Sequence, residues 1–370
     1  MRKPRVALVA DWLTNRGGAE RVILALRDIF PHAPVYTSVY NPDRLPGFEN
    51  CTVVTSFIQK LPFAKTKHFI YLPLMPYAFE QFDFSNFDIV ISSAHSAAKG
   101  IITKPRTLHI SYCHSPMRYC WDNSHEYVEQ YGIPSLLRRP AERLLSRLRV
   151  WDRVAADRVD FFIANSKYIK KRIQKYYRRD STVIYPPVDT SFFGGKPQTS
   201  EYYLAVGRLT PYKKFDLIIE VFNELKWPLV IVGDGKDMNS LKKKAGPTIR
   251  FLGNISDEEL RDVYMKAKAL VFPQVEDFGI APVEAMSAGK PVIAYAEGGA
   301  LETINPGLSG LFFEEQKPES LKKALLEFEA MRWTPSDVRK HAGQFDKKLF
   351  QEQILQFVEE KWGIWSREMA

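Results

Sequence analysis

The second half of the chain alternates short apolar runs with amphipathic segments, and this alternation restricts the fold more than any other feature. Five apolar runs have the length of buried strands, and three segments between them have helical periodicity. Strands joined by helices lie parallel in one sheet, with helices on both faces. We therefore predict an α/β fold here, with strands at 202–207, 229–232, 249–252, 269–273 and 291–296, and helices at 215–225, 237–244 and 257–268.

The first half repeats this pattern less regularly. Its strands are predicted at 6–13, 35–39, 88–93, 108–113 and 160–165, and its main helices at 19–30, 133–158 and 167–177. A chain of 370 residues is too long for one hydrophobic core, so we predict two Rossmann-like parallel-sheet domains. Pro186-Pro187 and the glycine- and proline-containing stretch 193–200 predict the boundary, which gives domains at 1–195 and 196–345 and a final helical segment at 346–370.

The cysteines and the hydropathy pattern bear on the compartment. Three unpaired cysteines without a CxxC motif indicate neither a disulfide framework nor a zinc site, which is typical of a reducing cytosol. No run of 18 apolar residues is present, so no membrane-spanning helix is expected. Residues 1–5 are basic, but the apolar run that follows is too short for a secretory signal. We expect a cytoplasmic protein.

The positive charge is concentrated in one region. Residues 131–180 carry an excess of nine positive charges, which equals the net charge of the whole chain. The helix predicted at 133–158 has leucines at helical spacing with arginines between them, a pattern that can lie on an anionic bilayer. An acidic lipid, a lipid-linked phosphate or nucleic acid would suit this charge, and the alternative is a solvated helix face.

A second candidate membrane surface is the aromatic stretch 68–82. Its aromatic and aliphatic side chains are either core residues or an exposed apolar patch, and the core interpretation is favoured.

The stretch VEDFGIAPVEAMSAG at 275–289 holds two carboxylates, Glu276 and Glu284, on either side of a predicted helix start. It follows a strand, so both side chains are expected at the crevice where open α/β sheets bind ligands. The N–H groups of residues 278–281 and the helix dipole favour an anion there. The alternative is that the two acids only cap the helix and keep the surface soluble.

Cations and glycine turns are expected at the same sheet edge. Arg208 directly follows the first strand of the second half, and Lys213 and Lys214 precede the next helix. Such an edge suits a pyrophosphate, because arginine can bind two phosphate oxygens and each charge-assisted bond contributes about 1.5–3 kcal/mol. Glu284 would accept both ribose hydroxyls, as acidic residues do in dinucleotide folds. The alternative is a solvated charge cluster at the strand ends.

Three features of the first half lie just past predicted strands. Gly17-Gly18 would let the backbone approach a ligand, although the pair is also an ordinary turn. His95 and His114 each follow a strand, where function accumulates in such sheets, although single histidines are more often structural.

The motifs GGAER at 17–21, SSAHSAAKG at 92–100, SYCHSPMRYCWD at 111–122, GRLTPYKK at 207–214 and EDFGIAPVE at 276–284 together resemble the family 4 retaining glycosyltransferases, and most closely their WbaZ-like mannosyltransferase branch. The resemblance covers nearly the whole chain. It implies the GT-B fold, in which two Rossmann-like domains face a central cleft. The acceptor then enters on the N-terminal domain, the nucleotide sugar lies mostly on the C-terminal one, and the last helix crosses back to the N-terminal domain.

The resemblance also implies roles for particular residues. Arg208 and Lys214 would neutralise the leaving diphosphate, Glu276 would hold the sugar hydroxyls, and His114 would contact the sugar near its anomeric carbon. Residues 252–255 would hold the base. The complete set is four catalytic residues, Arg208, Lys214, Glu276 and His114; ten donor-binding residues, Gly17, Gly18, Arg208, Lys213, Lys214, Phe278, Gly279, Ile280, Ala281 and Glu284; and two acceptor-binding residues, His95 and Lys99.

The expected reaction is transfer of mannose from GDP-mannose to a hydroxyl of a lipid-linked or polysaccharide acceptor, with retention at the anomeric carbon, during assembly of a bacterial cell-surface glycan such as lipopolysaccharide. No metal and no cofactor are expected, because the cations would take the metal's place. The enzyme would be peripheral at the inner face of the plasma membrane, through region 131–180. The alternatives are a UDP-sugar donor, a nucleotide-sugar epimerase or phosphorylase of the same architecture, and a basic nucleic-acid-binding module. The last lacks a recognised motif, so no nucleic-acid partner is expected.

Overall fold

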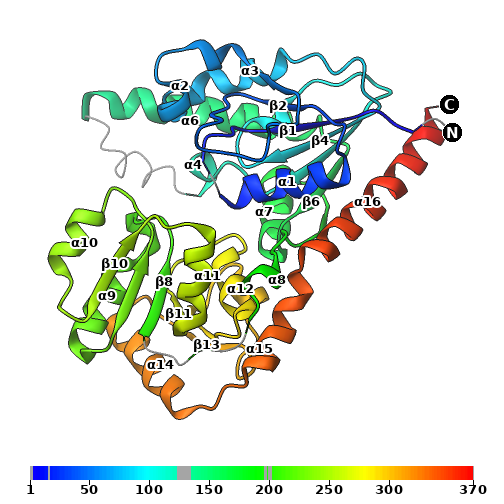
Figure 1. Ribbon diagram of the computed structural model, residues 1–370. Helices are drawn as coiled ribbons and strands as arrows, with labels where there is room; N and C mark the ends of the chain where they lie inside the picture. Colours follow the sequence, from blue (N-terminus) through cyan, green and yellow to red (C-terminus); the bar gives the residue numbers. More distant parts are fainter. Residues whose placement is uncertain (1–2, 16, 123–134, 196–197, 199–201, 370) are drawn as a thin grey trace. The chain divides into compact units, whose positions relative to one another are not determined.

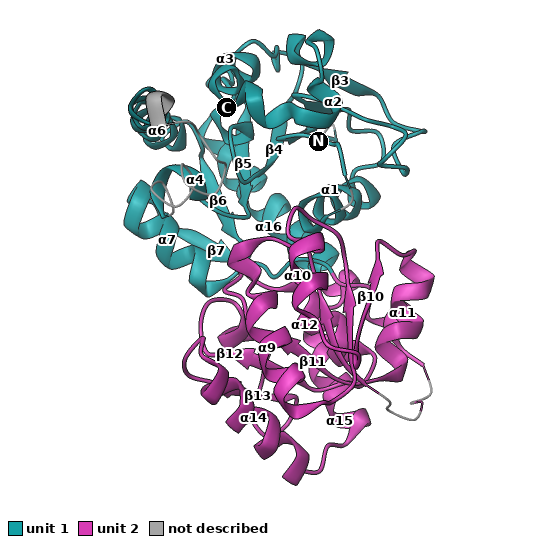
Figure 2. Cartoon of the chain, turned by 90° about the vertical axis from the view of Figure 1, so that its left-hand side faces the viewer, with its two compact units in different colours: residues 1–187, 350–370 teal, residues 188–349 magenta. Residues whose placement is uncertain are grey.

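A computed structural model describes residues 3–15, 17–122, 135–195, 198 and 202–369. The chain forms two compact units, which are described separately (Figure 2). Unit 1 comprises Met1–Pro187 and Phe350–Ala370, and unit 2 comprises Val188–Leu349. The boundary therefore lies eight residues before the predicted 195/196, because the short helix α8 (Thr190–Phe193) packs against α11 and α12 of unit 2.

Unit 1 is built on a seven-stranded parallel sheet with the strand order β3-β2-β1-β4-β5-β6-β7 (Figure 1). All pairs are parallel, as the strand–helix alternation predicts. The strands are β1 (Val6–Ala10), β2 (Val35–Thr37), β3 (Val53–Thr55), β4 (Ile89–Ala94), β5 (Leu108–Cys113), β6 (Phe161–Ala164) and β7 (Ser181–Val183).

Helices cover both faces of this sheet, and alternate residues of each strand supply the two cores. Leu8 of β1 packs with α1 and α16 on one face, and Val9 packs with the 3₁₀ segment η1, α3 and α6 on the other. The helical segments are α1 (Gly18–Ile29), η1 (Phe57–Lys60), α2 (Ala64–Lys67), η2 (His68–Leu74), α3 (Met75–Glu80), η3 (Ala98–Gly100), α4 (Arg118–Trp121), α6 (Ser135–Ala156), α7 (Lys167–Tyr177) and α16 (Lys347–Glu368).

Unit 2 is a six-stranded parallel sheet with the strand order β10-β9-β8-β11-β12-β13. The strands are β8 (Tyr202–Val206), β9 (Leu229–Val232), β10 (Ile249–Gly253), β11 (Ala267–Phe272), β12 (Val292–Tyr295) and β13 (Gly310–Phe313). The remaining elements are η4 (Pro211–Lys213), α9 (Phe215–Leu225), α10 (Met238–Lys244), α11 (Asp257–Lys266), α12 (Ile280–Ser287), α13 (Ala300–Thr303), α14 (Pro318–Ala330), α15 (Pro335–Ala342) and η5 (Gly343–Phe345).

The predicted α/β class and the parallel sheets are confirmed, and the edges of each sheet account for most of what the sequence did not predict. Three edge strands, β3, β7 and β13, were not predicted; each is only three or four residues long and gives a weak apolar pattern. In the aromatic stretch 68–82, the core interpretation holds for Met75 and Phe79 and is wrong for Phe69, Leu74 and Tyr77, which are exposed.

Helix α6 confirms the predicted basic amphipathic pattern but uses its apolar side within unit 1. Leu145 and Leu148 are buried in the core, while Arg138, Arg139 and Arg143 face solvent. Residues 123–134, which include the predicted start of this helix, lie outside the described residues. Within the described ranges, no helix combines the length and the apolar character that crossing a bilayer requires.

Helix α16 belongs to unit 1 through a buried apolar stripe. Phe350, Ile354, Phe357 and Val358 lie in the same core cluster as β1 and α1, although more than 300 residues of chain separate them. The Phe350 ring meets the Tyr112 ring of β5 at a centroid distance of 5.8 Å. The stripe explains why the C-terminal segment has apolar residues at helical spacing.

We expect Ile354→Ala to lower the free energy of unfolding of unit 1 by about 2–5 kcal/mol, because it leaves a cavity in a fully buried site. The neighbouring Leu355→Ala, on the exposed side of α16, should change it by less than about 0.5 kcal/mol. Urea denaturation of the full chain, followed by intrinsic fluorescence, measures both. Equal effects of the two substitutions would contradict the docking of α16.

Candidate active site

The predicted site residues fall into two groups, and each group lies at the point where the strand order of its own sheet reverses. In unit 2 this point lies between β8 and β11, and in unit 1 it lies between β1 and β4. The loops after these strands turn away from each other and leave a crevice at the carboxyl edge, which is where open α/β sheets bind ligands.

In unit 2, an ion pair joins the two loops at the reversal point. The Nζ of Lys213, at the end of η4, pairs with Oε1 of Glu276, which follows β11. Both side chains are partly buried, at 14% and 20% exposure, so solvent screens the pair less than a surface ion pair. Lys213 is thereby distinguished from Lys214, which the sequence alone did not do.

Arg208 and Lys214 provide positive charge at the same edge. Arg208 is exposed directly after β8, and Lys214 is the left-handed residue, with φ of 55°, that precedes α9. Neither side chain forms an ion pair within the described ranges. Two cations beside a Lys–Glu pair favour an anionic ligand at this edge.

Glu284 lies in α12 and is almost fully buried, at 4% exposure. Its Oε2 accepts a hydrogen bond of 3.0 Å from the hydroxyl of Tyr264, which comes from α11. The Tyr264 ring is held in turn by an edge-on contact with Phe193 of α8, at a centroid distance of 5.6 Å. Tyr264 fixes the direction of the carboxylate, and the sequence analysis did not identify it.

Two backbone features at the start of α12 bear on the predicted anion site, which stays a prediction. Gly279 precedes the helix with φ of 88°, and no side chain caps the first turn that contains Ile280 and Ala281. The Phe278 side chain is buried against Phe345, so only its backbone is available to a ligand.

The glycine turns after β9 and β12 pack the site loops against each other. A Cβ at Gly299 would lie 2.3 Å from the carbonyl oxygen of Phe278, and one at Gly235 would lie 2.2 Å from that of Leu209. These glycines therefore hold the loops after β11 and β8 in place, which is a different role from direct contact with a pyrophosphate.

In unit 1, Asp11 joins the loops after β1 and β4. Its Oδ2 accepts from the backbone N–H of His95 (2.7 Å) and of Ser96 (2.9 Å), and its Oδ1 accepts from the N–H of Ala98 (2.7 Å). The same carboxylate lies 3.2 Å from Nδ1 of His95 and is fully buried. Asp11 was not predicted as a site residue, because the first strand was predicted to run from 6 to 13. The observed β1 ends at Ala10, which places Asp11 directly after the strand, in the kind of position that singled out His95 and His114.

The two predicted histidines lie together. The rings of His95 and His114 are 6.1 Å apart between centroids, and Nε2 of His114 is 2.7 Å from the hydroxyl oxygen of Ser93. Desolvation by the surrounding residues, with the nearby His95 as a second cause, lowers the pKa of His114 from 6.5 to about 3. His114 is therefore neutral at physiological pH and acts as a hydrogen-bonding group and not as a cation.

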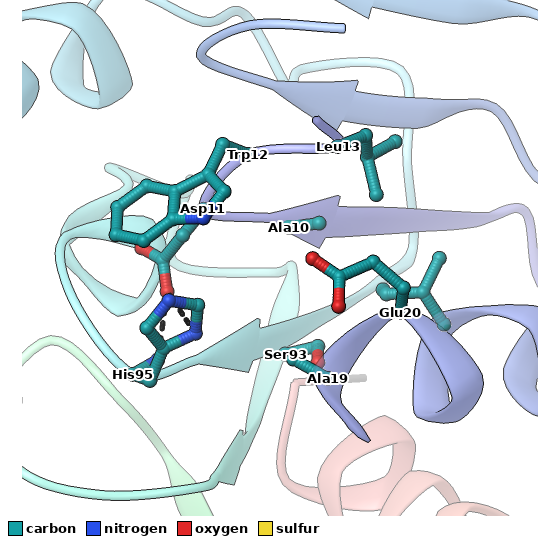
Figure 3. A pocket seen from close by; sticks show the side chains of 9 residues that line it. Ala10, Asp11, Trp12, Leu13, Ala19, Glu20, Ser93 and His95 are labelled. Carbon is teal, nitrogen blue, oxygen red and sulfur yellow. Dashed lines mark hydrogen bonds and ion pairs between the residues drawn. The ribbon is translucent and has the colours of Figure 1, made fainter. Parts of the chain in front are cut away.

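A small pocket opens at this edge of unit 1. Figure 3 shows Asp11 and His95 facing each other, with Trp12 beside them and Glu20 of α1 on the opposite side. Gly17 precedes α1, and a Cβ there would lie 2.8 Å from Oε2 of Glu20, so a larger residue would displace the end of this side chain. Gly18 is the first residue of α1.

Lys99 lies in the interior of unit 1, away from this pocket's lining. Its side chain is 2% exposed, its Nζ pairs with the buried Asp152, and it donates to the carbonyl of Ser96 at 3.1 Å. Asp152 also accepts from Trp121 and Tyr177, at 2.7 Å each. This placement argues against the predicted acceptor contact of Lys99 and gives it a structural role under the loop that carries His95.

Family models match both halves of the chain. Residues 16–192 match the model described as "Glycosyltransferase Family 4", and residues 189–348 match the model described as "Glycosyl transferases group 1". The junction between the two matches coincides with the boundary between the two structural units.

Curated relatives are similar over part of their length. The chain is 29% identical over 212 residues to an uncharacterized glycosyltransferase of Methanocaldococcus jannaschii, covering 56% of this chain and 60% of that protein. It is 32% identical over 155 residues to the O-antigen chain mannosyltransferase RfbU of Salmonella typhimurium, covering 38% and 43%. The chain thus spans about half the length of the curated relatives it matches.

A solved structure is similar over its whole length. The Anabaena protein HepE, in complex with UDP and glucose, aligns with a TM-score of 0.68 over 96% of this chain and 99% of that one. At 18% identity this similarity concerns the fold alone.

We expect Asp11→Ala to lower the free energy of unfolding of unit 1 by on the order of 3 kcal/mol, because three backbone N–H groups lose a buried acceptor. Asp11→Asn should recover only part of this, since an amide has one acceptor oxygen in place of two. Asp43→Ala, at an exposed position, is the control and should be neutral. Urea denaturation measures all three, and a neutral Asp11→Ala would refute the structural role of this carboxylate.

A second prediction concerns His109 of β5, whose buried ring lies 2.9 Å from the Ser92 hydroxyl. Desolvation lowers its pKa from 6.5 to about 4. Between pH 4 and pH 6.5, the His109 ring is protonated in the unfolded chain but neutral in the folded one. Its contribution to the free energy of unfolding is therefore complete above pH 6.5 and decreases as the pH falls. At about 1.4 kcal/mol per pH unit, the loss by pH 4 is about 3 kcal/mol. His109→Asn should flatten this slope in denaturation series from pH 7 to 4, and an unchanged slope would contradict the prediction.

Proposed function

The chain belongs to the family 4 glycosyltransferases of GT-B fold, and on that basis we propose that it transfers a hexose from a nucleotide diphosphate sugar to a hydroxyl group. The observation that carries the proposal is the cationic edge of unit 2. There, Arg208 and Lys214 flank the Lys213–Glu276 pair at the strand reversal point. This charge suits a diphosphate, and the carboxylates Glu276 and Glu284 suit the hydroxyls on either side of it.

In the proposed reaction, the anomeric carbon loses its bond to the diphosphate and gains one to the acceptor oxygen on the same face of the sugar. The leaving phosphate oxygen takes the acceptor's proton, so no enzymic nucleophile and no metal are used. Arg208 and Lys214 stabilise the charge that develops on the leaving group. Glu276 would exchange part of its contact with Lys213 for sugar hydroxyls when the diphosphate binds.

Glu284 and His114 have orienting roles in this proposal. Tyr264 holds the Glu284 carboxylate, which would accept from the ribose hydroxyls. A neutral His114, hydrogen-bonded to Ser93, would contact the sugar near its anomeric carbon without placing a positive charge there. His95, held by Asp11, would contact the acceptor.

We propose mannose as the sugar and GDP-mannose as the donor. The sequence resemblance supports this, as does the similarity to RfbU, which is named an O-antigen chain mannosyltransferase. A UDP-sugar is the second candidate, which the similarity in fold to the UDP-bound HepE structure favours. The proposed acceptor is a lipid-linked or polysaccharide hydroxyl in bacterial cell-surface glycan assembly, reached from the cytoplasmic side of the plasma membrane.

Isothermal titration with GDP and with UDP, each in EDTA, tests the donor site directly. Tight GDP binding without metal supports GDP-mannose, and a preference for UDP moves the donor to a UDP-hexose. Binding of neither nucleotide would count against the proposed donor site. Product analysis with and without an acceptor glycan separates transfer from epimerisation of the donor.

We expect Arg208→Ala to reduce kcat by about 10²–10³-fold, because it removes one group that stabilises the leaving diphosphate. Arg250→Ala, an exposed arginine on β10 of the same unit, is the matched control and should keep its activity. Steady-state kinetics with the nucleotide sugar identified by titration measures both. Wild-type turnover in Arg208→Ala would exclude the leaving-group role.

A further inference from the structure

Residues 51–79 of unit 1 form a surface that is apolar and basic at once. Between Cys51 and Phe79 the sequence has no Asp or Glu, whereas Lys60, Lys65 and Lys67 are all exposed. Six large apolar side chains of the same segment are 36–69% exposed: Phe57, Phe63, Phe69, Ile70, Leu74 and Tyr77. We call these nine residues the aromatic–basic patch.

The patch is a packed surface on a rigid base. Ile58, Ala64, Met75 and Phe79 from the same short helices are buried in the unit 1 core, so the exposed side chains project from ordered elements. The segments η1, α2, η2 and α3 contact one another in sequence order. In both Figure 1 and Figure 2, α2 and α3 lie along the upper margin of unit 1.

Two pairs of these exposed side chains are in contact with each other. The rings of Phe57 and Tyr77 are 5.7 Å apart, and Nζ of Lys67 lies 5.6 Å from the centre of the Phe63 ring. Large exposed apolar side chains gathered in this way mark an interaction site. The lysines among them select a partner that is both apolar and anionic.

The patch is connected to the candidate acceptor site. His68, within the patch segment, contacts Trp12 at a centroid distance of 4.5 Å, and Trp12 contacts His95 at the same distance. His68 also lies 3.5 Å from the Thr14 hydroxyl through Nδ1. A ligand anchored at the patch therefore lies close to the crevice that Asp11 and His95 line.

We propose that the aromatic–basic patch docks unit 1 on an anionic phospholipid surface, with the aromatic rings at the headgroup level and the lysines against the lipid phosphates. Two signals of this kind, apolar insertion and basic charge, are what stable peripheral binding requires. This docking surface rests on the proposed function, because docking on the membrane would bring a lipid-linked acceptor close to His95.

The structure favours this surface over the basic helix α6. The leucines Leu145 and Leu148 of α6 are buried in the unit 1 core, and among its described residues the large exposed apolar side chains are the short Val150 and Val154, against six larger ones in the patch. The patch has the larger apolar component, with five aromatic or leucine side chains and one isoleucine facing solvent beside its three lysines.

Vesicle co-sedimentation of the full chain tests the proposal, with phosphatidylcholine alone and with phosphatidylcholine containing phosphatidylglycerol. We expect binding only to the anionic vesicles, weakened by salt. The triple variant F63S/F69S/Y77S should lose at least roughly tenfold in affinity. The variant K60Q/K65Q/K67Q should lose roughly 100-fold, at about 1 kcal/mol per lysine.

Matched controls separate the patch from general surface effects. L308S/L326S removes two exposed leucines of unit 2, and K243Q/K323Q removes two exposed lysines of unit 2; both should bind vesicles as the wild type does. Replacement of Arg138, Arg139, Arg143 and Arg147 by glutamine should weaken binding less than the lysine variant does.

Three results would overturn the proposal. The first is absence of wild-type binding to anionic vesicles. The second is loss of binding in the arginine variant with full binding in both patch variants, which would assign the membrane surface to α6. The third is lipid-free self-association in sedimentation velocity that F63S/F69S/Y77S abolishes, since a second copy would then cover the patch. GDP and UDP titration of the same proteins is independent of vesicle binding, so failure of the donor site and failure of the patch are distinguished.

Discussion

The strand order of each sheet creates a gap, and in each unit a carboxylate closes it. Where the order reverses, the loops after two adjacent parallel strands turn to opposite faces, and no backbone hydrogen bond joins them within the part of the chain that the structure describes. In unit 1, Asp11 bridges the gap by accepting three backbone N–H groups from the loop after β4. In unit 2, Glu276 bridges it through the ammonium group of Lys213. The candidate site in each unit therefore depends on a carboxylate that bridges two loops, and the two bridges differ in how easily a ligand could break them.

The difference between the two bridges follows from their burial. Asp11 is fully buried and its partners are backbone groups, so its removal would leave donors unsatisfied. Glu276 and Lys213 are both side chains with some exposure to solvent, so an anionic ligand can reach the lysine and compete with Glu276 for it. The first bridge is suited to holding a loop in place, and the second is suited to a site that changes partners when its ligand binds.

Support below the sites is also polar. Under the loop that carries His95, Asp152 accepts from Lys99, Trp121 and Tyr177 in the interior of unit 1. A buried charge is tolerated only when it is paired and hydrogen-bonded, and here three donors satisfy one carboxylate. Such a network fixes the direction of its side chains. It is a physical reason for Lys99 to have a structural role, although this lysine lies in the motif SSAHSAAKG.

The sequence alone determined the α/β class, the parallel sheets, the approximate elements and the sheet edges at which Arg208, Glu276, Glu284, His95 and His114 lie. Apolar periodicity and chain order carry that information, because the carboxyl ends of parallel strands share one edge. Only the tertiary structure decided which lysine pairs with Glu276, that Tyr264 orients Glu284, that Lys99 points inward, and that Phe69, Leu74 and Tyr77 point outward. These outcomes depend on contacts between residues far apart in the chain and on which side of a short helix meets the core. A local pattern shows that a side chain is apolar or charged, but the packing of the whole unit decides what it faces.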